Sequence, residues 1–226
     1  MDSEHRRLVE RLQDKNTSGD GSFRYVEGTL GGNHLILTQC GIGKVSAAVG
    51  ASELIRRFSP DCIVSTGVAG GIDACLKVTD VVASQRLVYH DVWCGDGNEY
   101  GQVQGFPASY EGCSSLLKHA LSLNEAGMES RIHSGLVCTG DQFITNRTEL
   151  DTIKQRFPDG LAVDMESAAI AQTCYLYNVP FLSFRIISDT PGVEDHASQY
   201  ADFWGTMAER SFLTIWTFLS TLPSNL

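Results

Sequence analysis

Three carboxylates follow apolar runs in the second half of the chain, at positions where strands are expected to end. Asp164 and Glu166 come after residues 161–163, and Asp189 comes after residues 181–187. Carboxylates that meet in one place can transfer protons or stabilise a positive charge that develops during a reaction. These residues therefore mark the first candidate for a reactive site.

A strand–helix–strand unit would bring these carboxylates together. Residues 161–163 and 181–187 are apolar and β-rich, as strands buried on both faces are. Residues 167–177 carry apolar side chains at helical spacing, and Asn178 and Pro180 follow as stop signals. We expect a βαβ unit with parallel strands, whose carboxyl ends lie together at the edge of the sheet where ligands bind.

Arg185 lies inside the second apolar run, on the face of the expected strand that also carries Asp189. A charge in a buried strand is costly unless it is paired. One interpretation is therefore a structural ion pair between Arg185 and one of the acids. That pair would explain the arginine, but not three acids at one strand edge.

Composition excludes several classes of partner and places the chain in a reducing compartment. The 226 residues are 42% hydrophobic and carry a formal net charge of −10, with no basic run, so nucleic acid and anionic membranes are not expected partners. The seven cysteines are dispersed and show no zinc-ligand spacing, which favours the cytoplasm. No signal peptide or membrane span is recognisable, and the length suits one well-buried domain.

Helical and strand-like segments alternate along the chain, which predicts an α/β class. Besides 167–177, helices are predicted for residues 1–14, 45–58, 113–123, 147–157 and 203–222. Strands are also predicted for residues 23–30, 34–39, 61–65, 81–84, 87–89 and 131–138. The Gly31-Gly32 pair predicts a hairpin turn. The loop 90–110 exceeds the usual length, so we expect it to serve a site or an interface.

Two glycine-rich stretches follow predicted strands. Residues 40–44 precede a helix, where glycines let a ligand approach the backbone, and residues 66–71 form a second expected glycine turn. Residues 40–44 lack the P-loop spacing and also differ from the dinucleotide-binding pattern. An ordinary tight turn is the alternative interpretation.

Four ordered motifs resemble the purine nucleoside phosphorylase/uridine phosphorylase superfamily and, within it, the 5′-methylthioadenosine/S-adenosylhomocysteine nucleosidases. The motifs are GIGKVSAA from Gly41, TGVAGG from Thr66, GDQFI from Gly140, and VDMES followed by RIISD. The resemblance implies a single α/β domain with a central mixed, twisted sheet flanked by helices. It also implies adenine nucleosides as substrates, a homodimer, and no metal or organic cofactor.

The resemblance assigns residues to the purine end of a nucleoside site. Ser188 and Asp189 match the pair that meets the purine. Phe143 matches the aromatic residue that stacks on adenine, and Ile144 matches the residue whose backbone meets the edge of the base.

Other matching residues are assigned to the sugar. Met165 and Glu166 match the family's ribose-binding pair. Val68, Ala69 and Gly70 match the glycine-rich stretch beside the sugar and the base.

The 5′ end of the substrate and the reacting water involve residues nearer the ends of the chain. Ile42 matches the pocket wall near the 5′ substituent, and Tyr200 or Phe203 resembles the aromatic lid over the alkylthio group. Glu4 resembles the acid that activates water, whereas its spacing alone indicates a first-turn acid that favours the helix dipole. The family has an apolar strand before this segment, and this sequence shows none, so we expect that first strand to be missing.

The resemblance implies a mechanism that the residue types can perform. Adenine leaves well when its N7 is protonated, so Asp189 must hold a proton although an ordinary aspartate has a pKa of about 3.9. Glu4 would take a proton from water, and Glu166 would face the cationic, oxocarbenium-like sugar. Arg185 would hold the water or restrain the acids.

Three alternatives stay open at this point. A phosphorylase would need a cationic cradle for phosphate, and the glycine-rich stretches hold few basic residues. A futalosine-type nucleosidase would perform the same chemistry on another 5′ group. A non-catalytic relative that binds or stores nucleosides would be expected to lose the acids, yet Glu4, Glu166 and Asp189 are all present.

Overall fold

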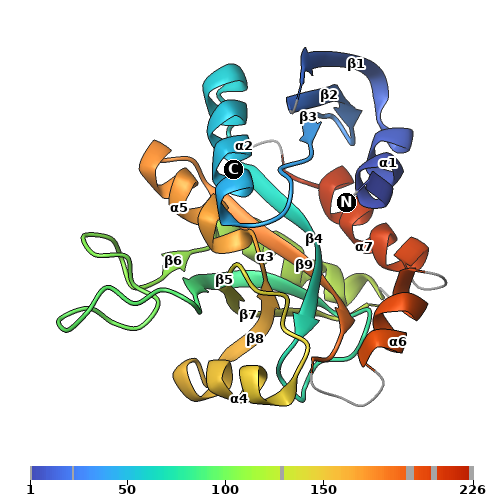
Figure 1. Cartoon of the computed structure of the whole chain (residues 1–226). Helices are drawn as coiled ribbons and strands as arrows, with labels where there is room; N and C mark the ends of the chain where they lie inside the picture. The colour runs from blue at the N-terminus through green and yellow to red at the C-terminus, as the bar shows by residue number, and fades with distance from the viewer. Residues whose placement is uncertain (1, 22, 128–129, 192–195, 205–207, 224–226) are drawn as a thin grey trace.

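Helices and strands alternate through the computed structural model of the chain, which describes residues 2–21, 23–127, 130–191, 196–204 and 208–223 (Figure 1). The helices are α1 (Asp2–Arg11), α2 (Lys44–Phe58), α3 (Ser114–Ser122), the 3₁₀ helix η1 (Leu123–Ala126), α4 (Arg147–Arg156), α5 (Ser167–Tyr177), α6 (His196–Asp202) and α7 (Ala208–Ser220). The strands are β1 (Gln13–Asp20), β2 (Phe23–Leu30), β3 (Asn33–Thr38), β4 (Ile63–Gly71), β5 (Val81–Tyr89), β6 (Tyr110–Glu111), β7 (Ile132–Thr139), β8 (Gly160–Asp164) and β9 (Phe181–Asp189). The predicted α/β class is confirmed.

The larger sheet is mixed and closes on itself. Its six strands run in the order β6-β5-β7-β8-β4-β9, and a further pairing joins β9 back to β5. β5, β7 and β8 are mutually parallel, as are β4 and β9, whereas β4 is antiparallel to β8 and β5 is antiparallel to β9. The mixed sheet that the family resemblance implied is therefore present.

The expected βαβ unit with parallel strands is wrong, because β8 and β9 are neither adjacent nor parallel. β4 lies between them, parallel to β9 and antiparallel to β8. The ends of the two strands nevertheless meet, because Gly70 of β4 is opposite both Val163 of β8 and Asp189 of β9. The carboxylates are therefore brought together by a shared neighbouring strand rather than by a direct strand pairing.

Strand β4 also corrects the prediction of a glycine turn at residues 66–71. The strand continues through these residues to Gly71, so the predicted strand 61–65 ended too early. At Gly70 a glycine is needed because Pro191 packs closely against the strand, not because the chain turns. A Cβ atom at this position would lie 2.8 Å from Pro191 Cγ. The glycine allows the segment after β9 to pack directly on β4.

The small antiparallel sheet β1-β2-β3 contains the predicted hairpin and one strand that was not predicted. Leu30 is opposite Asn33 across the turn between β2 and β3, which confirms the hairpin. The predicted helix 1–14 is too long, because α1 ends at Arg11 and β1 begins at Gln13. β1 has the polar, almost wholly exposed sequence QDKNTSGD, so only its pairing with β2 identifies it as a strand.

Two further predictions differ from the structure by more than their terminal residues. Residues 81–84 and 87–89 belong to the single strand β5, whose pairing with β7 is irregular between Ser84 and Arg86. The predicted helix 203–222 is wrong at its start, because α6 ends at Asp202 and α7 begins at Ala208. Phe203, Thr214 and Phe218 are buried, whereas Leu213 is exposed. Met207 lies outside the described residues.

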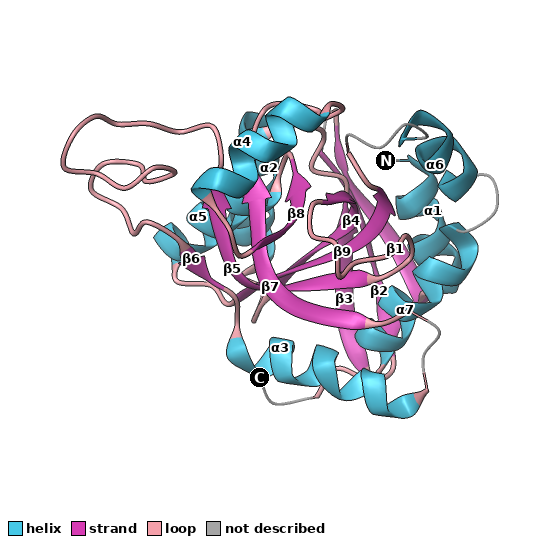
Figure 2. Ribbon diagram, turned by 90° about the horizontal axis from the view of Figure 1, so that it is seen from below, coloured by secondary structure: helices cyan, strands magenta, loops and turns pink. Residues whose placement is uncertain are grey.

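Helices cover the larger sheet on two sides (Figure 2). α2 and α5 pack on each other and on one side, with small buried residues such as Ala47, Ala51 and Ala168 at the contact. α3 and α7 pack on the other side, where the rings of Phe184 and Phe218 stack with centroids 4.7 Å apart, and α1 packs on α7 and on β3 of the small sheet. The loop between β5 and β6 extends away from this body in both views. Within the described residues, no helix combines the length and the apolar character that a bilayer span requires.

Candidate active site

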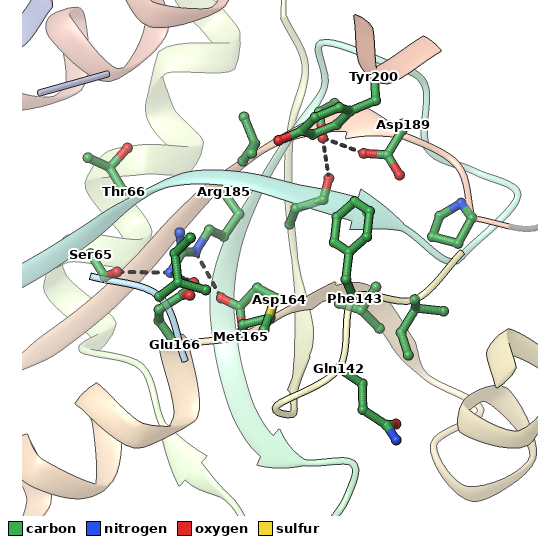
Figure 3. A pocket seen from close by; sticks show the side chains of 18 of the residues that line it. Ser65, Thr66, Gln142, Phe143, Asp164, Met165, Glu166, Arg185, Asp189 and Tyr200 are labelled. Carbon is green, nitrogen blue, oxygen red and sulfur yellow. Dashed lines mark hydrogen bonds and ion pairs between the residues drawn. The ribbon is translucent and has the colours of Figure 1, made fainter. Parts of the chain in front are cut away.

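A cavity of about 200 Å³ lies where β4, β8 and β9 end, and the segment after β7 forms one of its walls (Figure 3). The predicted site residues line this cavity, except Phe203 and except Glu4, whose side chain lies outside the described part of the chain. Segments that are more than a hundred residues apart in the chain, such as Ile42 and Asp189, therefore meet around one space.

Arg185 connects two of the three carboxylates. Its Nε atom lies 2.9 Å from Asp164 Oδ2, and its Nη2 atom lies 3.6 Å from Glu166 Oε2. The guanidinium also donates hydrogen bonds to the hydroxyls of Ser167 and Ser65, each at 3.1 Å. The structural ion pair is therefore present, and the same arginine also lines the cavity.

Asp164 is held by the protein on several sides. Its Oδ1 accepts a hydrogen bond from Thr139 Oγ1 at 2.6 Å, and its carboxylate also accepts from the backbone N–H and the hydroxyl of Ser167. With Arg185 as a further partner, Asp164 joins the ends of β7, β8 and β9 to the start of α5. Of the three carboxylates, Asp164 therefore suits a structural role better than a reactive one.

Glu166 immediately precedes α5 and is fixed from across the cavity. The backbone N–H of Gly43 donates to Glu166 Oε1 at 3.1 Å. Gly43 has a φ of 86°, in the left-handed region that favours glycine, so this residue type allows the turn. Burial raises the pKa of Glu166, although Arg185 opposes that rise. The site thus contains a positioned carboxylate that shares the Arg185 guanidinium with Asp164.

Asp189 lies at the opposite end of the cavity, beside an aromatic wall. It is 3% exposed, and its Oδ1 accepts a hydrogen bond from Ser188 Oγ at 2.5 Å. The Phe143 and Tyr200 rings meet edge to face with centroids 5.9 Å apart, and Phe143 is 59% exposed. Figure 3 shows Phe143, Tyr200 and Asp189 grouped around the same part of the cavity. A flat, apolar group with a polar edge would fit this arrangement.

The two aromatic residues proposed for the lid lie in different surroundings. Tyr200 lines the cavity. Phe203 is fully buried in the core, where it contacts the Trp204 ring at 5.3 Å between centroids. Sequence alone left the choice open because α6, which carries Tyr200 and ends at Asp202 just before Phe203, was not recognised from the sequence.

Thr66 lines the cavity, but the sequence analysis named it only as the start of a motif and not as a site residue. Its Oγ1 atom is buried and has no hydrogen-bond partner among the described residues. Buried polar groups are normally paired, so this hydroxyl is available to a water or a ligand. The sequence held a signal for this role. Thr66 lies two residues before the predicted site residue Val68, so both side chains are on the same face of the strand.

Glu4 lies on α1, but its side chain is outside the part of the chain that the structure describes. The next residue, His5, lines a second cavity of about 340 Å³ between β3, α2 and β4. The two cavities share several lining residues, including Ile42 and Thr66. α1 therefore begins beside the candidate site, and the role of Glu4 stays a prediction.

The charge of the cavity limits which ligands it can hold. Of the described residues that line it, only Arg185 is basic, and that side chain contacts two carboxylates. A phosphate ion would meet net negative charge here. Among the described residues there is also no group of three or more His, Cys, Asp or Glu side chains suited to a metal ion.

Comparison with known proteins identifies the family. A sequence profile of the phosphorylase superfamily matches residues 1–220. The chain is 41% identical to a 5′-methylthioadenosine/S-adenosylhomocysteine nucleosidase of Chromohalobacter salexigens, over 88% of this chain and 85% of that protein. It belongs to this nucleosidase family. A second member, from Tolumonas auensis, is 36% identical over 98% of this chain and 96% of its own length.

Solved structures of nucleosidases share the fold over nearly the whole chain. The Neisseria meningitidis nucleosidase, in complex with methylthio-immucillin-A, matches with a TM-score of 0.92 and 34% identity, covering 98% of this chain and 96% of that chain. The Colwellia psychrerythraea nucleosidase, in complex with adenine, matches with a TM-score of 0.93 and 34% identity, covering 100% and 94%. The α/β architecture described above is therefore that of the nucleosidase family.

Proposed function

We propose that this protein hydrolyses the N-glycosidic bond of 5′-methylthioadenosine and S-adenosylhomocysteine, releasing adenine and the 5′-thioribose product. The observation that carries the proposal is a single cavity with the Ser188–Asp189 pair at one end and the fixed carboxylate of Glu166 at the other. Membership of the nucleosidase family and the adenine bound to the Colwellia relative support the same assignment.

The purine would occupy the end of the cavity that holds Phe143 and Asp189. Phe143 offers a ring face for stacking, and buried Ile144 holds the backbone that would meet the edge of the base. Asp189 would donate a proton to N7, so that adenine departs as a neutral base while the electrons of the C1′–N9 bond move onto the purine. The Ser188 hydroxyl, which donates to Asp189, fixes the orientation of that carboxyl group.

The ribose would lie against Met165 and Glu166. As the glycosidic bond breaks, positive charge develops on the sugar, and a fixed carboxylate stabilises that charge more than it stabilises the neutral substrate. Gly43 and Arg185 hold Glu166 from two directions, so little reorganisation is needed when the charge appears. Val68, Ala69 and Gly70 would form the wall beside the sugar and base.

The attacking water would lie between the sugar and the start of β4. Thr66 Oγ1 and the Arg185 guanidinium both face the cavity and can orient a water molecule. Glu4 would accept its proton as the oxygen bonds to C1′. The proton given by Asp189 and the proton taken by Glu4 balance, so the reaction consumes one water molecule.

The 5′-thio substituent would extend towards Ile42 and Tyr200. Ile42 is 68% exposed, and Val45 and Val49 of α2 are exposed beside it along the chain. A second copy of the chain packed on this apolar face would bury these side chains and close the 5′ end of the cavity. We therefore include a homodimer in the proposal. All seven cysteines are free, which supports a reducing, cytoplasmic location.

The alternatives receive less support from the site. A phosphorylase needs a cationic site for phosphate, whereas the only basic lining residue among those described contacts two carboxylates. A nucleoside-binding protein without activity would not need Glu166 and Asp189 on opposite sides of the glycosidic bond. A futalosine-type substrate differs only beyond the 5′ carbon, so the choice depends on the wall at Ile42 and Tyr200.

The proposal is tested by incubating the purified protein separately with methylthioadenosine, S-adenosylhomocysteine, futalosine and inosine, and measuring release of the base. We expect adenine from the first two nucleosides and much slower release of hypoxanthine from the others. Asp151→Asn, which changes an exposed acid on α4, is the matched control for variants of the site acids. Preference for futalosine or inosine would overturn the substrate assignment.

A further inference from the structure

Lys44 connects three loops that are distant in the sequence. It is the first residue of α2 and follows Gly43, whose N–H holds Glu166. Its Nζ atom lies 2.9 Å from each carboxylate oxygen of Asp91, in the loop after β5, and 3.6 Å from Asp141 Oδ2, in the loop after β7. One ammonium group therefore lies between two carboxylates from different loops.

Backbone hydrogen bonds complete this network of Lys44, Asp91 and Asp141. The N–H of Lys44 donates to Asp141 Oδ1 at 2.8 Å, and the N–H of Asp141 donates to Asp91 Oδ2 at 2.9 Å. Lys44 and Asp91 are mostly buried, whereas Asp141 is about half exposed. The network is thus partly shielded from water, which strengthens its charge–charge interactions relative to those of surface pairs.

The residues next to Asp141 and next to Lys44 line the cavity or hold a residue that lines it. Asp141 precedes Gln142 and Phe143, which line the cavity at the purine end. Gly43, on the other side of Lys44, fixes the carboxylate of Glu166 at the ribose end. Lys44 itself is not among the described residues that line the cavity.

We propose that Lys44 is a positioning residue, which holds the purine-stacking loop and the turn that fixes Glu166 at a set distance from each other. The proposal rests on the proposed nucleosidase function, because it assigns these two segments to the base and the sugar. Without the Lys44 ammonium group, the like charges of Asp91 and Asp141 would repel each other, and only backbone hydrogen bonds would hold the loop after β7 near α2. Stacking and transition-state stabilisation would then weaken together.

The test compares Lys44→Met, Lys44→Arg and the double variant Lys44→Met/Asp141→Asn with the parent enzyme. Arg147→Met is the control, since it removes an exposed ion pair with Asp151 near the same loop. For each protein, kcat and KM on methylthioadenosine, the Kd of adenine and the backbone hydrogen exchange of residues 139–144 are measured. The melting temperature is recorded to separate loss of stability from loss of positioning.

We expect Lys44→Met to lower kcat/KM about tenfold to a hundredfold, the range that small misplacement of reacting groups can produce. The Kd of adenine and the exchange rate of residues 139–144 should both rise. Lys44→Arg should retain most of the activity, because a guanidinium keeps the positive charge and can donate hydrogen bonds to both carboxylates. The double variant should recover part of the lost activity, since it removes the repulsion between the two acids.

Unchanged kinetics in Lys44→Met, with only a lower melting temperature, would show a merely structural role and overturn the proposal. Unchanged exchange of residues 139–144 would also overturn it, because Lys44 would then not hold the loop. The exchange measurement needs no substrate. If the parent enzyme released no adenine, the proposed function would fail, and the exchange comparison would still decide whether Lys44 orders the loop.

Discussion

Arg185 Nε lies 2.9 Å from Asp164 Oδ2, and the two side chains are 5% and 1% exposed. This buried pair keeps the guanidinium beside Glu166 and the cavity, where it can act on a water or on the neighbouring carboxylate. The positive charge of the site is therefore supplied by a residue whose position the fold itself determines.

Asp164→Asn should lower the free energy of unfolding by about 3–5 kcal/mol, because it leaves the Arg185 charge buried without its main partner. Urea denaturation followed by circular dichroism measures this change, and Asp151→Asn should change stability by less than about 0.5 kcal/mol. A small effect in Asp164→Asn would mean that Glu166 and the nearby hydroxyls are sufficient to compensate the guanidinium.

Asp189→Asn should fold normally and lose most of its turnover. An asparagine can still accept a hydrogen bond from Ser188, but it cannot give a proton to the departing adenine. General acid catalysis is typically worth about 10²–10⁴-fold, and we expect kcat on methylthioadenosine to fall within that range. Near parental rates in this variant would be incompatible with Asp189 as the acid.

Glu166→Gln should weaken binding of the transition state more than binding of the substrate. The carboxylate faces charge that exists only as the bond breaks, so kcat should fall while KM changes little. Steady-state kinetics on methylthioadenosine separate the two constants. A raised KM with an unchanged kcat would show that Glu166 contributes only uniform binding.

The raised pKa of Glu166 predicts a pH dependence of stability. Burial raises this pKa above its ordinary value of 4.5, so the folded protein binds the proton more tightly than the unfolded chain. The contribution of Glu166 to the free energy of unfolding should therefore decrease as pH rises from about 4.5 through the folded-state pKa. Subtracting the unfolding curve of Glu166→Gln from that of the parent isolates this contribution. A difference that is constant with pH would refute the shift.

Glu4→Gln separates the two interpretations of the N-terminal helix. A first-turn acid contributes about 0.3–1 kcal/mol to a helix and nothing to chemistry, whereas loss of a water-activating base should lower kcat by at least about 10²-fold. We expect a nearly unchanged melting temperature, unchanged adenine binding and very slow hydrolysis. Equal activity in Glu4→Gln and the parent would return Glu4 to the helix-dipole interpretation.

Local sequence signals predicted those elements whose boundaries are set by nearby residues. α5 begins and ends at the predicted residues, and Asn178 closes it in the left-handed conformation with a φ of 55°. β9 is buried along its whole length, as its apolar sequence indicated. In contrast, β1 is polar and exposed, so its strand conformation depends on a partner that local sequence does not reveal.

The arrangement of the site depended on long-range pairing that periodicity cannot predict. The position of β4 between β8 and β9 is set by closure of the whole sheet, and no local pattern encodes that order. The residues that the family motifs assign to the site, such as Met165, lie around the cavity, and Tyr200 does so too, whereas their roles stay predictions. The contact of Lys44 with Asp91 and Asp141 spans 47 and 97 residues of sequence, so only the folded chain shows it.

The central claim is that water, rather than phosphate, attacks C1′ of an adenine nucleoside in this cavity. The most direct measurement is the reaction of methylthioadenosine in ¹⁸O-labelled water, with and without phosphate, followed by mass spectrometry of the sugar product. We predict free methylthioribose that carries one ¹⁸O atom at C1, formed at the same rate under both conditions. Formation of a sugar 1-phosphate, or a requirement for phosphate, would contradict the account.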